Sequence, residues 1–278
     1  TGIQNFRRIS GGYFGPSGLY GAVQKKKVII FPQKIRRIIN MNFTEQLNEV
    51  GIVLNDTQRS QFDKYFEILV EWNGFMNLTG ITEYEEVLVK HFLDSLAVGK
   101  YSEKFAGNPE LSIIDVGTGA GFPGLPLKIA YPQAKVVLLD SLNKRVKFLD
   151  EVITQLGLTG ITAVHARAEE GARNAAYREQ FDISVSRAVA NLSTLVEYCL
   201  PFVKAGGYFI AYKSGDIDAE AEGAKRAVSL LGGRIESVEK MTLPGTDIER
   251  SFVFVKKEKP TPKKYPRKAG LPSKEPLG

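Results

Sequence analysis

From residue 110 onward, the chain alternates short β-branched runs with stretches in which apolar residues recur every three or four positions. Such runs, bounded by glycine and polar residues, predict strands. Their expected bounds are residues 111–116, 135–140, 161–165, 181–186, 207–213, 233–241 and 251–256. Seven strands that alternate with helices predict an α/β fold with a mostly parallel, doubly wound sheet, which binds ligands at the carboxyl ends of its strands.

The segment before the first strand has helical spacing and predicts a small helical subdomain over residues 41–106. Asp56 is expected to cap one helix, and Thr82 with Glu85 to form the capping box of another. Between them, the string W-N-G-F-M-N-L-T at residues 72–79 suits a structured turn whose tryptophan and leucine anchor the core. Among the sheet's own helices, two are expected over 192–203 and 219–231.

The most distinctive stretch is I-I-D-V-G-T-G-A-G-F-P-G at residues 113–124, where a buried strand turns into a glycine-rich loop. Glycines remove side chains where the backbone must bend sharply, so the loop can press against a ligand. A helix is expected just after it, presenting its unpaired backbone N–H groups. The stretch therefore predicts a nucleotide-type binding turn, and the domain that contains it is expected over residues 107–257.

Two ligand classes compete for this loop. Gly119, Gly121 and Gly124 match the G-x-G-x-x-G of dinucleotide enzymes, with Asp140 ending the next strand where a ribose would lie. Counted from Asp115, the loop is D-x-G-x-G-x-G, the pattern associated with S-adenosylmethionine enzymes. A carboxylate repels a pyrophosphate but attracts the cationic amino and sulfonium groups of S-adenosylmethionine, which favours the methyl donor over a nicotinamide cofactor.

Polar residues at the next strand ends complete a nucleoside pocket. Asp140 can accept from ribose hydroxyls, and the segment 166–170, including Glu169, can offer N–H groups and a carboxylate to an adenine edge. Arg187 closes the fourth strand, where it could bind a carboxylate or an RNA phosphate. His91 and Asp94 lie one helical turn apart, which suits either a structural histidine or a substrate contact.

Charge is divided unevenly along the chain. Residues 1–40 carry a net charge of +8, residues 41–255 of −8 and residues 256–278 of +6. The first segment has no sustained period and is expected to lie outside the fold, as a leader, a basic RNA-binding arm or a transit peptide. The last, rich in proline and lysine, predicts an extended basic tail over 258–278, either solvated or in contact with RNA. The candidates for RNA contact are His91, Lys144, Arg145, Arg187, Lys213, Lys263, Lys264, Tyr265, Arg267 and Lys268.

Composition narrows the remaining classes. No apolar run reaches the roughly 20 residues of a membrane span. One cysteine, Cys199, and two histidines predict neither a disulfide framework nor a zinc site, and they place the protein in a reducing cytoplasm. Cys199 lies within an expected helix, where a buried structural thiol is favoured over a nucleophile.

Several strings are too long for chance agreement: D-V-G-T-G-A-G-F-P-G-L-P, L-D-S-L-N-K-R-V-K-F-L, R-A-E, S-R-A-V-A, W-N-x-x-M-N-L-T, K-H-F-L-D-S-L and T-P-K-K-Y-P-R-K-x-G. In these strings the chain resembles the ribosomal small-subunit methyltransferase G family, also called glucose-inhibited division protein B. The resemblance implies a class I S-adenosylmethionine-dependent methyltransferase that modifies guanine N7 in 16S rRNA, acting on the small subunit, its assembly precursor or free rRNA. By position it implies these cofactor contacts, with Asp140 at the ribose: Gly117, Phe122, Ala168, Glu169 and Arg187.

Guanine N7 carries a free lone pair and no proton, so its methylation needs alignment and exclusion of water rather than a general base. A sequence without an evident acid–base pair is compatible with that reaction, and Arg187 and Lys213 are the candidates for a positioning role in a monomeric enzyme. Two alternatives remain open: a non-catalytic RNA-assembly factor that keeps the cofactor fold, and a nicotinamide-dependent oxidoreductase.

Overall fold

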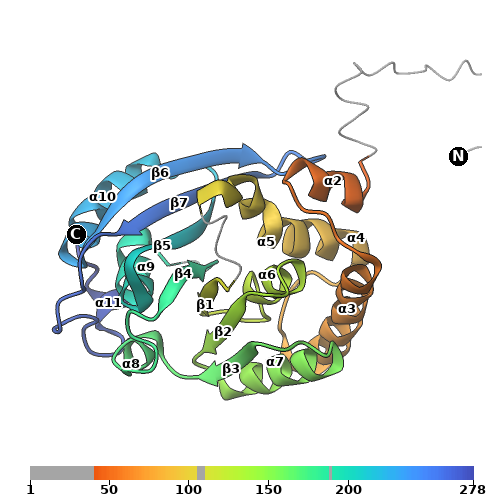
Figure 1. Cartoon of the computed structure of the whole chain (residues 1–278), viewed down its shortest axis with the longest axis horizontal. Coiled ribbons are helices and arrows are strands. Elements are labelled where there is room, and N and C mark those ends of the chain that lie inside the picture. Colours follow the sequence, from red (N-terminus) through yellow and green to blue (C-terminus); the bar gives the residue numbers. More distant parts are fainter. Residues whose placement is uncertain (1–40, 105–109, 188–189) are drawn as a thin grey trace, which may run out of the picture.

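The computed structural model describes residues 41–104, 110–187 and 190–278, and the expectations for residues 1–40 lie outside these ranges. Within them, seven strands form one sheet in the order β3-β2-β1-β4-β5-β7-β6 (Figure 1). The pairs from β3 to β5 are parallel, whereas β7 runs antiparallel to β5 and β6. The strands are β1 (Ser112–Val116), β2 (Lys135–Asp140), β3 (Ile161–His165), β4 (Phe181–Ser186), β5 (Val203–Ser214), β6 (Gly233–Thr242) and β7 (Glu249–Lys257).

Helices cover both faces of this sheet (Figure 1). Those before and among the first strands are α2 (Phe43–Glu49), α3 (Asp56–Met76), α4 (Tyr84–Val87), the π-helix η1 (Leu88–Leu93), α5 (Asp94–Leu96), the 3₁₀ helix η2 (Ala97–Lys104), α6 (Gly124–Ala130) and α7 (Asn143–Gln155). Those that follow are α8 (Ala168–Gly171), α9 (Leu192–Cys199), the 3₁₀ helix η3 (Leu200–Phe202), α10 (Asp218–Leu230) and α11 (Leu271–Lys274). None of the helices in the described ranges is long and apolar enough to cross a membrane.

The alternation of side chains along each strand divides the core into two buried clusters. Ile113 faces the cluster formed with α3, α5, α6 and α7, and its neighbour Ile114 faces the cluster formed with α9 and α10. The helices of residues 41–104 therefore share a continuous apolar core with the sheet. The division at residues 106 and 257 stays a prediction.

The helix caps differ from the expected ones. Asn55 rather than Asp56 caps α3, since its side chain accepts from the N–H of Gln58 at 2.9 Å and the Gln58 side chain accepts from the Asn55 N–H in return. The capping box expected from Thr82 and Glu85 is absent from this part of the chain, because α4 begins at Tyr84 and no side chain caps it.

The bounds of β2, β3 and β4 agree with the predicted ones, but β5 begins four residues earlier than predicted, at Val203 rather than Gly207. The reason lies in the preceding helix, which was predicted to continue to residue 203. It ends at Cys199, because Pro201 follows in a tight 3₁₀ turn and cannot donate to an α-helical ladder. Strand β5 can therefore begin at Val203, directly after this turn.

Residues 258–278 were predicted to be an extended tail, but they are folded against the body. The Arg178 guanidinium donates to the carbonyl oxygens of Tyr265 at 3.0 Å and Thr261 at 2.8 Å, and Arg173 donates to Pro266 at 2.6 Å. The carbonyl groups of a proline-rich segment find few partners in regular secondary structure. Here the guanidinium groups of Arg173 and Arg178 donate to them instead.

A buried ion pair joins this C-terminal segment to α9. Glu197 is fully buried, and it accepts from the Arg267 Nε at 3.0 Å, from its Nη2 at 2.7 Å and from its backbone N–H at 2.7 Å. Two parallel bonds of this kind fix both the position and the orientation of the guanidinium.

Arg267→Ala should destabilise the fold by about 3 kcal/mol, because it leaves the Glu197 carboxylate buried without its counter-ion. Urea unfolding would measure the loss. Lys225→Ala serves as a matched control, since Lys225 pairs with Glu222 where both side chains are more than half exposed, and such pairs contribute little. Equal stability of the two variants would show that the ion pair does not hold the segment in place.

Candidate functional site

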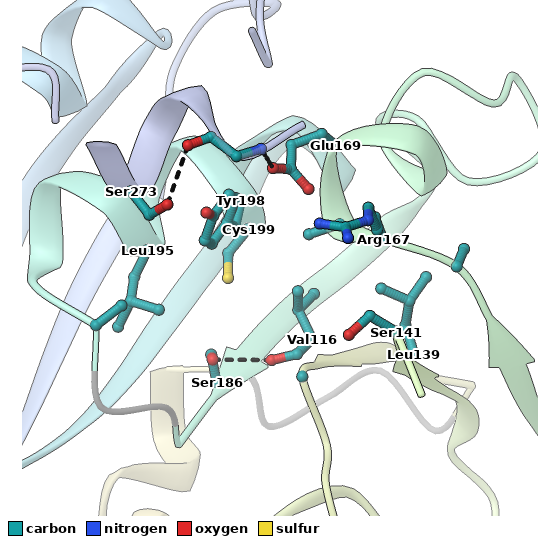
Figure 2. A pocket seen from close by; sticks show the side chains of 15 residues that line it. Val116, Leu139, Ser141, Arg167, Glu169, Ser186, Leu195, Tyr198, Cys199 and Ser273 are labelled. Atoms are coloured by element: carbon teal, nitrogen blue, oxygen red, sulfur yellow. Dashed lines mark hydrogen bonds between the residues drawn. The ribbon is translucent and has the colours of Figure 1, made fainter. Parts of the chain in front are cut away.

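A cavity of about 260 Å³ lies at the carboxyl ends of β1, β2 and β4 (Figure 2). We call it the first cavity. Val116, Leu139 and Leu195 give it apolar walls, and Glu169 supplies a carboxylate. The sheet order reverses between β1 and β4, which is where doubly wound folds bind their ligands.

The glycine loop borders this cavity. The N–H groups of Gly117 and Thr118 both donate to the Leu139 carbonyl, at 2.8 and 3.2 Å, so the loop starts fixed to the end of β2. Gly117 and Gly119 have φ angles of +74° and +63°, and a Cβ on either would project into open space. The loop therefore exposes bare backbone at these two positions, and its contact with a ligand stays a prediction.

Gly121 has a different function. A Cβ there would approach Leu125 Cδ1 to 2.3 Å and the Tyr65 hydroxyl to 2.7 Å. Its missing side chain thus permits packing against α3 and α6, and the structure gives no indication that Gly121 faces the first cavity.

Asp140 ends β2 and is 2% exposed. Its Oδ2 accepts from the Gly119 N–H at 2.9 Å, and its Oδ1 accepts from the Leu142 N–H at 2.9 Å. Arg145 approaches Oδ2 at 3.5 Å. The carboxylate therefore orders the glycine loop and the start of α7, and its contact with a ribose stays a prediction.

Asp115 lies beneath the loop rather than on its ligand face. Its Oδ2 accepts from the Thr118 hydroxyl at 2.6 Å and from the Gly124 N–H at 2.8 Å, and a Cβ on Gly124 would come within 2.9 Å of that oxygen. Its Oδ1 is buried and makes no hydrogen bond to the described residues. Burial raises the pKa of Asp115 to about 7, against the opposing effect of these bonds and of Arg187. Asp115 thus has a structural role in the loop, and its attraction to a cationic ligand stays a prediction.

Ala168 and Glu169 line the first cavity from the start of α8, where the sequence places them. Glu169 Oε1 accepts from the Gly270 N–H at 2.8 Å, and Gly270 and Ser273 complete the wall (Figure 2). Sequence reasoning missed both C-terminal residues, because nothing in a proline-rich segment signals that it returns to the sheet. Cys199 also reaches the wall, and burial raises the pKa of its thiol.

Phe122 is in an aromatic cluster outside the first cavity. It is 6% exposed, its ring stacks on His91 with centroids 4.6 Å apart, and the Arg187 guanidinium lies 4.9 Å from its centroid. This arrangement supports the packing role that the residue type suggests. The cofactor contact implied by resemblance stays a prediction.

Arg187 lines a second cavity, of about 370 Å³, rather than the first. Its Nη1 donates to Asp94 Oδ2 at 2.8 Å, while Arg250 Nε donates to Asp94 Oδ1 at 2.7 Å. One buried carboxylate thus holds two guanidinium groups. Asp94 lies in the string K-H-F-L-D-S-L quoted above, but no local pattern points to Arg250, which is 156 residues away.

Lys213 also lines the second cavity. Its Nζ donates to Glu220 at 2.7 Å and to the Ala190 carbonyl at 2.7 Å. Ala190 lines the first cavity, and its carbonyl accepts from Lys213 of the second cavity, so the two cavities adjoin at this residue. Residues 188–189 of that segment lie outside the described ranges.

His91 is held inside the helical layer. Its Nε2 is 2.8 Å from the Thr79 hydroxyl, and its Nδ1 is 3.4 Å from the Arg187 guanidinium. Burial and the charge of Arg187 lower the pKa of His91 to about 4, so the ring is neutral near pH 7. A neutral, half-buried imidazole suits the structural role better than a phosphate contact.

The remaining RNA candidates fall into two groups. Lys144, Lys263, Lys264 and Lys268 are exposed, as a phosphate contact requires. Tyr265 is only 7% exposed and Arg267 pairs with Glu197, so the prediction of an accessible stacking ring amid free charges is wrong for these two residues. Arg145 is half-buried toward Asp140.

The sheet order, the glycine loop at its switch point and the acid that ends β2 define a Rossmann-like class I methyltransferase fold. The family model of rRNA small subunit methyltransferase G, GidB, matches residues 58–252. The chain belongs to this family.

Proteins named ribosomal RNA small subunit methyltransferase G are similar over nearly their whole length. The one from Lachnoclostridium phytofermentans is 55% identical over 86% of this chain and 97% of its own. Those from Alkaliphilus metalliredigens and Acetivibrio thermocellus are 52% and 50% identical, over 82% and 88% of this chain and 95% and 97% of theirs.

We expect Asp140→Ala and Gly119→Val each to weaken S-adenosylmethionine binding at least ten-fold. The first removes the acceptor that orders the loop, and the second adds a β-branched side chain at φ +63° where the backbone faces open space. Isothermal titration calorimetry measures both. Gly223→Ala, in the exposed middle of α10, is the control. Unchanged affinity in both loop variants would contradict the assignment of the cofactor to this loop.

Stability should depend on pH through Asp115. Its folded pKa of about 7 is above the unfolded value of 3.8, so the folded state binds the proton more tightly and the contribution of Asp115 to stability falls as pH rises from 4 to 7. Asp115→Asn removes this term, and the variant should gain stability relative to the wild type across that interval. Chemical denaturation at several pH values tests this, and a constant difference would contradict it.

Proposed function

We propose that this protein transfers a methyl group from S-adenosylmethionine to N7 of a guanine in 16S rRNA. The observation that carries the proposal is a pair of cavities with different chemistry that adjoin where Lys213 donates to the Ala190 carbonyl. The first cavity suits a nucleoside, and the second suits a nucleotide of RNA with its base and phosphate. Membership of the methyltransferase family indicates that a methyl group passes from the ligand of the first cavity to the ligand of the second.

The first cavity fits the cofactor. Bare backbone at Gly117, apolar walls and the Glu169 carboxylate match a ligand with an adenine ring, a ribose and cationic groups. The cofactor supplies an electrophilic sulfonium methyl group when it is bound. In this proposal, Asp140 keeps the loop in its binding shape, and Ala168 and Glu169 contact the adenosine.

The second cavity fits the RNA. Arg187, Arg250 and Lys213 bring three cations to its walls, against the two carboxylates of Asp94 and Glu220. The excess of one positive charge favours a phosphate, and the carboxylates can accept from the N–H groups on a guanine edge. Arg187 and Lys213 would then position the base, and Asp94 would position Arg187.

Methyl transfer to guanine N7 requires no further catalytic group from the protein. Guanine N7 attacks with a lone pair that carries no proton, and the positive charge passes from sulfur to the base without a net change. Alignment and a dry site are therefore sufficient, and a neutral His91 behind Arg187 removes no proton in this reaction.

The working form that we propose is a cytoplasmic monomer that modifies the small subunit or its assembly precursor. The lone cysteine is buried at the cofactor cavity, which suits a reducing compartment. Exposed lysines of the C-terminal segment, Lys263, Lys264 and Lys268, would add contacts to rRNA phosphates.

Incubation with methyl-labelled S-adenosylmethionine and either naked 16S rRNA or assembled small subunits tests the activity. We expect label at guanine N7, detected by its susceptibility to borohydride and aniline cleavage, and we expect Lys213→Gln to lower kcat/KM at least ten-fold while the cofactor affinity is unchanged. Lys225→Gln, on the exposed face of α10, is the control.

Binding of cofactor and RNA without transfer of label would instead indicate the assembly-factor alternative. Tight binding of a nicotinamide dinucleotide without S-adenosylmethionine binding would indicate the oxidoreductase.

A further inference from the structure

The ends of α3 and α7 meet at the edge of the sheet that carries the glycine loop. Gln61 Nε2 donates to the Leu156 carbonyl at 3.0 Å, and farther along α3 the Trp72 ring lies 5.7 Å from that of Phe148. As the residue number rises on α3 it falls on α7, so the two helices run antiparallel. The carboxyl end of α3 therefore lies beside the start of α7, which directly follows β2 and Asp140.

Apolar side chains are exposed at this junction. Phe75 is 68% exposed and Leu142 42% exposed, and they are two of the five large hydrophobic residues found exposed in the described ranges. The ring of the half-buried Trp72 packs against that of Phe75, with ring centroids 5.3 Å apart. Lys144, on the first turn of α7, adds an exposed cation. We call Trp72, Phe75, Leu142 and Lys144 the α3–α7 patch.

Hydrogen bonds and ring contacts connect the patch to the site. Asn77 ends α3 in a left-handed conformation, with φ +50°, and the Asn73 side chain accepts from the Thr79 N–H at 2.9 Å. Thr79 in turn bonds His91, whose ring stacks on Phe122 beside Arg187. On the other side, Arg145 reaches Asp140 at 3.5 Å. These contacts link the patch to Arg187 of the second cavity and to Asp140, which orders the glycine loop.

We propose that the α3–α7 patch binds an unpaired nucleotide of the RNA substrate, with the base stacked on Phe75 and a flanking phosphate on Lys144. The inference rests on the proposed function for the identity of the polymer. An exposed aromatic ring beside a cation is the combination that single-stranded nucleic acid recognises, since every base offers a π-face and every linkage a negative charge.

A second copy of this chain fits the patch less well. A symmetric contact would place two copies of Lys144 in one interface around a small apolar centre, and like charges so close together oppose such a contact. Charge complementarity therefore favours the polyanion.

The chain has a single tryptophan, Trp72, and it reports on this patch directly. Its fluorescence is followed while a single-stranded oligoribonucleotide of about ten residues is added. We expect quenching in the wild type and in Phe75→Tyr. Phe75→Ala should bind about ten-fold more weakly by the anisotropy of a labelled oligonucleotide. Lys144→Gln should lower the salt dependence of binding by about one ion.

Val53→Ala is the matched control, because Val53 is a hydrophobic residue 80% exposed elsewhere on the surface. Equal affinity of Phe75→Ala and Val53→Ala would overturn the inference. So would light scattering that shows a wild-type dimer and a monomeric Phe75→Ala protein, which would assign the patch to a second copy.

These measurements need neither cofactor nor turnover. RNA binding through Phe75 without methyl transfer would contradict the proposed function and leave the inference standing. Methyl transfer by Phe75→Ala with an unchanged KM for RNA would contradict the inference and leave the proposed function standing.

Discussion

The buried carboxylate of Asp115 is the constraint on which the site depends. Its Oδ2 receives the hydroxyl of Thr118 and the N–H of Gly124, so one oxygen ties the start of the glycine loop to the first turn of α6. The close approach of that turn leaves no room for a side chain at Gly124. Removing a carboxylate from water is costly, and the fold tolerates it here because the same atom fixes the shape of a loop that would otherwise be free. The glycines allow the backbone of the loop to bend, and the two hydrogen bonds to Asp115 hold it in one conformation.

A second buried carboxylate organises the other cavity. Asp94 is 3% exposed and lies between two guanidinium groups that come from β7 and from the end of β4. Such a cluster places Arg187 by three constraints at once: the ion pair with Asp94, the stacking over Phe122 and the contact with His91. Positioning of this kind matters in a reaction that needs alignment rather than proton transfer, because a misplaced cation costs rate without changing the chemistry. The helical layer before the sheet is thus part of the site.

Sequence reasoning succeeded where the deciding interactions are local. The β-branched runs gave the bounds of β2, β3 and β4, and the glycine spacing located the loop. It failed where the deciding partner is distant in the chain. The fold of the C-terminal segment depends on guanidinium donors about ninety residues earlier, at Arg173 and Arg178, and no period within the segment could reveal them. The pairing of Arg250 with Asp94 was invisible for the same reason. Tyr265 illustrates the error: a ring among lysines suggests a stacking surface, but the ring is buried in the apolar cluster formed with α9 and α10, and its backbone carbonyl accepts from Arg178.

The distribution of rings between core and surface follows from the same network. Family resemblance placed Phe122 at the cofactor and the residue pattern placed Tyr265 at RNA, and both rings are buried. Phe75 lies in the last turn of α3, in a stretch expected to be a structural turn, and is 68% exposed. Hydrogen bonds between Asn73 and Thr79 and between Thr79 and His91 link the end of α3 to the surroundings of Arg187. In our proposal, a base bound outside the cavities would add to alignment at the reacting atom, since fixed contacts far from the chemistry lower the entropy cost of reaching the aligned geometry. The α3–α7 patch would then position the substrate as well as recognise it.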